Sequence, residues 1–141
     1  MNRKRKIMKR FAEFINDQFL INEMARVGQI DELEICVYNR EGGNVPHIHI
    51  RDYTTMGKTF DCCVKLEAPE YFDHGFHTDK LTTKQKHQLN DFMNAKPKYS
   101  AERTNYEFAV SMWNNNGSNR IVEIEYYDDG RVIVPDYSTL H

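Results

Sequence analysis

The residues with the clearest chemical potential lie in one short segment, Pro46-His47-Ile48-His49-Ile50-Arg51. Successive side chains of a β-strand point to opposite faces, so a strand here would place His47, His49 and Arg51 on one face. Imidazoles exchange protons near neutral pH, and a guanidinium binds phosphate. We therefore expect catalytic roles for His49 and His47 and an anion-binding role for Arg51. The alternative is a polar sheet face satisfied by water and cross-strand partners.

Two further histidines, in the segment Asp73-His74-Gly75-Phe76-His77, add a metal-binding alternative. Imidazole nitrogens are common transition-metal ligands, and a carboxylate or thiolate from Asp61 or Cys63 could face the same side. No spacing here matches a zinc finger or a zincin helix, so the prediction requires the fold to bring the second pair of histidines over the first. The candidate metal ligands are His47, His49, His74 and His77.

Three predicted strands position these residues. Residues 33–38 alternate with period two, residues 46–53 follow a Gly-Gly turn, and residues 58–66 follow a second turn at Met56-Gly57. Strands joined by short turns form an antiparallel meander, here over residues 32–66. We expect one face of the meander to be buried, with this set of core side chains: Ile48, Ile50, Phe60, Cys62 and Val64.

The rest of the chain contributes helices and a hairpin. Apolar spacing predicts an N-terminal helix over residues 5–26 that stops at Gly28, and capping boxes at Thr82 and Thr104 open two shorter helices. An Asp-Asp-Gly turn predicts a C-terminal hairpin over residues 120–134. The fold class we expect is therefore α+β, with an antiparallel sheet of about five strands packed by these three helices.

Length and composition indicate how many domains the chain forms and in which compartment it is found. The 141 residues predict a single domain over 1–141, and three cysteines, two of them adjacent, favour a reduced, cytoplasmic protein. No apolar run approaches the length of a membrane span, so no membrane association is expected. Six of the 19 basic residues lie among the first ten positions. Residues 1–6 are accordingly either a disordered basic arm that contacts phosphates or a solvated first helical turn.

The order of these parts resembles a family of small bacterial domains of unknown function whose hallmark is a Pro-Pro-His-Phe-His strand. The matching residues are Pro46-His47-Ile48-His49-Ile50, the strand from Phe60 to Leu66, His74-Gly75, the helix around Leu89 to Met93, and Trp113-Asn114, within residues 33–115. Members of that family are often encoded beside small partner genes in toxin–antitoxin-like operons. The resemblance implies a small protein or RNA partner and carries no activity over.

A second, local resemblance is to the histidine-triad nucleotide hydrolases, whose strand reads His-x-His-x-His after a glycine-rich turn. It implies that His49 is the nucleophile on a nucleotide phosphate and that His47 orients or stabilises it. Arg51 stands where that family has its third histidine.

Three functions follow as hypotheses. The first is an interaction module of a toxin–antitoxin-like or mobile-element pair, with a small protein partner. The second is a histidine-dependent phosphodiesterase, RNase-like enzyme or nucleotide hydrolase, acting on RNA or a nucleotide through His47, His49 and Arg51. The third is a metal-binding protein. The sequence leaves open whether the protein is an enzyme, and it does not predict an oligomeric state.

Overall fold

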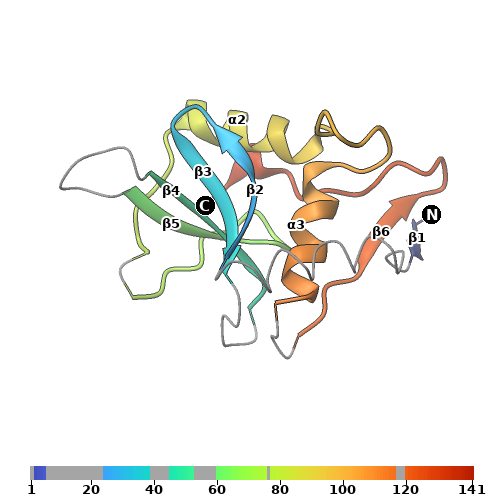
Figure 1. Cartoon of the computed structure of the whole chain (residues 1–141), viewed down its shortest axis with the longest axis horizontal. Coiled ribbons are helices and arrows are strands. Elements are labelled where there is room, and N and C mark those ends of the chain that lie inside the picture. The colour runs from blue at the N-terminus through green and yellow to red at the C-terminus, as the bar shows by residue number, and fades with distance from the viewer. Residues whose placement is uncertain (1, 6–23, 39–44, 53–59, 76, 117–119) are drawn as a thin grey trace.

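A four-stranded antiparallel sheet is the main feature of the computed structural model, which describes residues 2–5, 24–38, 45–52, 60–75, 77–116 and 120–141. The strands lie in chain order across the sheet (Figure 1): β2 (Met24–Ile30), β3 (Leu33–Tyr38), β4 (His47–Asp52) and β5 (Phe60–Lys65). The strand that carries the two central histidines, β4, is therefore an interior strand with a neighbour on each side.

The register of the sheet confirms the predicted meander and its alternation. Ile50 pairs with Cys62 and His49 pairs with Cys63 across β4 and β5, so the apolar and the polar side chains of β4 fall on opposite faces. Four of the five side chains expected in the core are fully buried, namely Ile48, Ile50, Cys62 and Val64. Phe60 differs, because it is half-buried at the start of β5 and only packs against the core.

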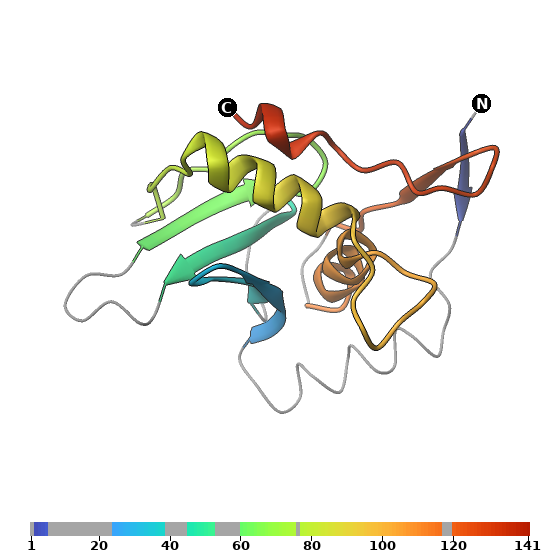
Figure 2. The same ribbon diagram turned by 90° about the horizontal axis from the view of Figure 1, so that it is seen from above.

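Helices cover the apolar face of the sheet. The two predicted capping boxes are present, at Thr82 for α2 (Thr83–Asn94) and at Thr104 for α3 (Asn105–Asn114). In Figure 2, α2 and the short 3₁₀ helix η1 (Tyr137–Thr139) lie over one side of the sheet. Leu89 and Met93 of α2 are fully buried there.

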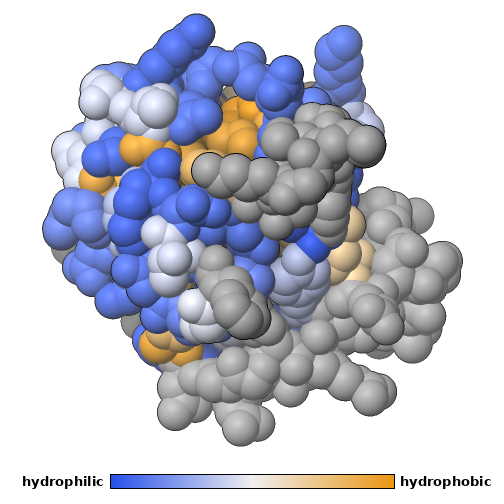
Figure 3. Space-filling model, turned by 90° about the vertical axis from the view of Figure 1, so that its left-hand side faces the viewer, coloured by the Kyte–Doolittle hydropathy of each residue, from blue (hydrophilic) through white to orange (hydrophobic). Residues whose placement is uncertain are grey.

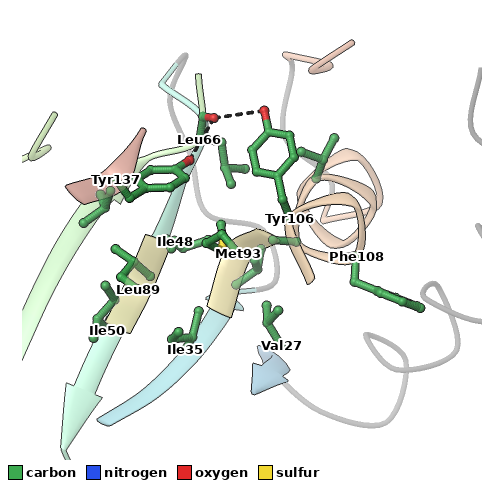
Figure 4. Close-up of a cluster of buried hydrophobic side chains, with 14 of the residues drawn as sticks. Val27, Ile35, Ile48, Ile50, Leu66, Leu89, Met93, Tyr106, Phe108 and Tyr137 are labelled. Atoms are coloured by element: carbon green, nitrogen blue, oxygen red, sulfur yellow. Dashed lines mark hydrogen bonds between the residues drawn. The ribbon is translucent and has the colours of Figure 1, made fainter. Parts of the chain in front are cut away.

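Two buried tyrosines join the helices to the end of β5. Tyr106 of α3 and Tyr137 of η1 each donate a hydrogen bond of 3.1 Å to the carbonyl oxygen of Leu66, as Figure 4 shows. A buried carbonyl needs a donor, and here two side chains distant in sequence supply one each. The contact fixes the helical layer against the strand that carries Cys63.

The N-terminal helix prediction is wrong where the structure can test it. Residues 24–26, its expected last turn, belong to β2, and Gly28, its expected stop, lies within the same strand. The ring of Phe92 approaches so closely that a Cβ on Gly28 would lie 2.5 Å from it. A side chain at this position would therefore force the Phe92 ring to move. The remainder of that predicted helix, residues 6–23, lies outside the described residues.

The C-terminal hairpin forms, but not as part of the main sheet. Its first strand is β6 (Ile124–Tyr127), and its second is reduced to a bridge between Tyr126 and Val132. β6 pairs instead with β1 (Asn2–Arg5), so this part of the basic N-terminal segment is a paired strand. The α+β class is supported. The expected sheet of about five strands is instead four strands plus a separate pair.

In the described ranges, no helix combines the length and the apolar character needed to cross a membrane. Among the coloured residues in Figure 3, hydrophilic ones predominate, and the hydrophobic ones lie in a few small areas.

Candidate metal centre

The polar face of β4 is as deeply buried as its apolar face. His47 and His49 are 2% and 1% exposed, although both lie on the face of β4 opposite to the core side chains Ile48 and Ile50. Burying an imidazole costs free energy unless its nitrogens find partners. These two histidines therefore lie in a structured polar site and not on a solvated sheet face.

A segment that follows β5 brings further histidines to this face. It lies along the free edge of β5, because the amide of Phe72 donates to the carbonyl of Cys63 and the amide of Asp79 donates to the carbonyl of Asp61. Between these two anchors the chain turns at Gly75, whose φ of +54° is the left-handed region that glycine tolerates best. The turn brings the rings of His74 and His77 to 4.7 Å between centroids.

Donor atoms from three separate parts of the chain converge at this point. Sγ of Cys63 lies 3.3 Å from Nδ1 of His49 and 3.2 Å from Nε2 of His74. One ligand atom from each of four residues lies within 4.8 Å of the others. We call these residues the first donor set: His47, His49, Cys63 and His74.

The spacing suits a tetrahedral metal ion. With zinc–nitrogen bonds of ~2.0–2.1 Å and a zinc–sulfur bond of ~2.3 Å, a tetrahedral site places sulfur and nitrogen about 3.5 Å apart. The contacts of Cys63 to His49 and His74 are within a few tenths of an ångström of that value. A thiol has a single proton, so it can donate to only one of the two imidazoles. A cation between the three atoms would satisfy all of them at once.

His47 is oriented as a ligand would be. Its Nδ1 lies 2.7 Å from the carbonyl oxygen of Val45, which can only accept, so Nδ1 is the donor in this bond and Nε2 is the ring nitrogen that could ligate an ion. Metal-binding histidines commonly use such a bond to fix the ring and its tautomer. The ring also packs against Phe72 and Trp113, with centroids 4.9 and 5.3 Å away.

A second donor set overlaps the first: His49, Asp61, Cys63 and His77. Asp61 lies between two imidazoles, with Oδ1 3.5 Å from Nδ1 of His49 and Oδ2 2.8 Å from Nδ1 of His77. His49 and Cys63 belong to both sets. The four predicted histidines thus lie close together but do not form one donor set. In the second set, Asp61 and His77 take the places of His47 and His74.

The cross-strand neighbour of Asp61 is Arg51, which sequence analysis assigned to anion binding. Its side chain is nearly buried. The guanidinium lies 3.4 Å from the carboxylate of Glu34 and 4.8 Å from the centre of the Tyr38 ring. These contacts hold Arg51 on the same sheet face as the histidines. The anion-binding role remains a prediction.

The adjacent cysteines occupy different environments. Cys63 is in both donor sets, whereas Cys62 points into the hydrophobic core. Burial, aided by the negative charges of Asp61 and Asp79, raises the pKa of the Cys62 thiol to about 12. Cys62 is therefore a neutral core residue, and only its neighbour is placed to act as a ligand.

Sequence reasoning named Cys63 and Asp61 only as residues that could join the histidines. The signal that identifies them is the strand register, since His49 pairs with Cys63 and Asp61 lies two positions before it on the same face.

No protein-family model, curated protein or solved structure matches this chain. The resemblances to the small bacterial family and to the histidine-triad hydrolases, and the interaction-module and hydrolase functions drawn from them, remain predictions.

Proposed function

We propose that this protein binds a transition-metal ion, with zinc as the best fit, through the first donor set. The observation that carries the proposal is the convergence of three imidazoles and one thiol, from β4, β5 and the segment after β5, within 4.8 Å. Imidazole and thiolate together favour zinc and other borderline or soft cations over magnesium or calcium, which prefer oxygen ligands.

The role that this geometry supports best is a structural one. Four protein ligands close the coordination sphere of zinc, whereas catalytic zinc keeps one position for water. The ion would connect His74, in the segment beyond β5, to the centre of the sheet at His49. Metal binding would therefore stabilise the attachment of residues 71–78 to the sheet.

Burial supports ligand roles over nucleophilic ones. His47 and His49 are almost inaccessible, so a phosphate group could reach neither ring without displacement of the segment that carries His74. A buried imidazole whose Nδ1 already donates to a backbone carbonyl is in contrast well placed to coordinate an ion through Nε2.

The direct test is the metal content of protein purified without chelator. We expect at least one equivalent of zinc per chain, and we expect His74→Ala and His47→Ala to lower zinc affinity by about 10-fold or more. His87→Ala is the matched control, because this imidazole is exposed on α2 and belongs to neither donor set. It should leave zinc content unchanged.

Two outcomes would refute the proposal. One is wild-type protein that holds no zinc and does not bind added Zn²⁺, Co²⁺ or Cu⁺. The other is zinc that is lost equally from His87→Ala and His74→Ala.

A further inference from the structure

The second donor set contains buried polar atoms that no protein group satisfies. Nδ1 of His77 and Oδ1 of Asp61 are both buried, and in the described part of the chain neither has a hydrogen-bond partner. The two side chains nevertheless meet, with Oδ2 of Asp61 2.8 Å from the same Nδ1. The contact therefore lacks hydrogen-bond geometry, and a metal ion ligated by both side chains would satisfy Nδ1 of His77 and Oδ1 of Asp61.

We propose that Asp61 and His77 bind a second divalent metal ion next to the first, with the thiolate of Cys63 shared between them. The inference rests on the proposed zinc site, because Cys63 and His49 belong to both donor sets. A carboxylate, an imidazole and a thiolate are all zinc ligands. Paired ions in metalloproteins lie ~3.5–4 Å apart, a separation that a single bridging ligand can span.

The two positions differ in their access to solvent. The first set has one half-buried ligand, His74, whereas the second has two, Asp61 and His77, whose side chains are 19% and 26% exposed. His49 as a neutral imidazole can ligate only one ion, and its first-set partners already surround it. The second ion would then have three protein ligands, with the fourth position left for water that enters from the side of His77.

This arrangement predicts unequal affinities. The first ion has four protein ligands, while the second has three and is repelled by its neighbour. The negative charges of the Cys63 thiolate and the Asp61 carboxylate offset part of that repulsion. We expect the second ion to bind at least 10-fold more weakly than the first and to exchange faster.

The experiment is a titration of the chelator-treated full-length protein with Zn²⁺, in which native mass spectrometry counts ions per chain. Wild type should bind two, and Asp61→Asn and His77→Ala should bind one. Two controls should still bind two: His87→Ala for loss of an exposed imidazole, and Asp73→Asn for loss of an exposed carboxylate in the same segment. His77→Gln replaces His77→Ala if the smaller side chain unfolds the protein.

Each other outcome overturns the inference in a distinguishable way. One ion in wild type that Asp61→Asn and His77→Ala retain with unchanged affinity would show that these residues bind no metal. One ion whose affinity falls in both variants would make them positioning groups for the first site. No ion in wild type would refute the zinc site itself.

Discussion

Sγ of Cys63 lies 3.3 Å from Nδ1 of His49, its direct cross-strand partner on β4. Opposed side chains in an antiparallel pair have Cβ atoms only about 4.5–5.5 Å apart, so the pairing alone brings thiol and imidazole together. Because β4 is hydrogen-bonded to a strand on each side, the backbone at His49 is held in place by both β3 and β5. His47 joins this pair from β4 itself, and His74 is added from the segment beyond β5.

The adjacent cysteines provide a matched test of that contact. Cys63→Ala should abolish or strongly weaken zinc binding, because it removes the only sulfur donor of the first set. Cys62→Ala should keep full zinc content and lose about 1–2 kcal/mol of stability, as expected for truncation of a small core side chain. Zinc analysis and urea denaturation of the two variants measure both effects. Equal zinc loss in both would contradict the assignment of Cys63.

Thiol reactivity gives an independent readout of the same pair. With a pKa of about 12, Cys62 has about a thousandth of the thiolate of an ordinary cysteine at pH 8, so iodoacetamide should leave it unmodified in the folded protein. Cys63 should be protected by zinc and should become reactive after chelation. Peptide mass mapping before and after treatment with chelator measures both. Rapid alkylation of Cys62 in the folded protein would show that it is not buried in the core.

The only tryptophan reports on metal binding without any label. The Trp113 ring lies 5.3 Å from the ring of His47 and is fully buried. A paramagnetic ion such as Co²⁺ bound to His47 should therefore quench its fluorescence strongly, while Zn²⁺ should change it little. His47→Ala should remove the quenching at concentrations that saturate wild type. Equal quenching in that variant would place the ion elsewhere.

The strand alternation that puts His47 and His49 on one face is visible in the sequence, and so are the two capping boxes. The β2 strand cannot be recognised from the sequence, because its alternation is interrupted. The helical pattern places Met24 and Val27, three residues apart, on one face. The buried side chains of β2 are instead Ala25, Val27 and Ile30, with a bulge between Arg26 and Gly28 that shifts the alternation by one residue. A local pattern with this spacing predicts the wrong element.

For the ligands outside β4, the sequence indicates which residue types could bind a metal but not which of them meet. Nothing in the spacing of His74 and Cys63 indicates that they meet, because their contact depends on the backbone hydrogen bonds that hold Phe72 and Asp79 to β5. Likewise, the register that places Cys63 opposite His49 is set by the length of a connection between strands. Non-local pairing of this kind has no signature in a single sequence.

Stability at high pH should depend on the two tyrosines that share the Leu66 carbonyl. Burial raises the pKa of both Tyr106 and Tyr137, so folding favours their neutral forms. This contribution is fully present below about pH 10, where tyrosines of the unfolded chain are still neutral, and it is lost as pH rises through the higher pKa values of the folded state. The free energy of unfolding of wild type should therefore fall steeply above pH 10.

The matching variant is Tyr106→Phe combined with Tyr137→Phe. Each loss of a hydrogen bond should cost about 1 kcal/mol at neutral pH, and the double variant should cost more, since the buried carbonyl of Leu66 then lacks both donors. Above pH 10 the variant should lose stability less steeply than wild type. Urea denaturation at pH 7 and pH 11 compares them. Parallel pH profiles would mean that the two hydroxyls do not control alkaline unfolding.

X-ray absorption at the zinc edge, on protein loaded with one equivalent of Zn²⁺, tests the central claim most directly. The proposed site predicts a first shell of one sulfur at ~2.3 Å and three nitrogens at ~2.0–2.1 Å, and Cys63→Ser should remove the sulfur component. A shell of nitrogen and oxygen alone in the wild-type protein, or a sulfur component that survives in Cys63→Ser, would contradict it.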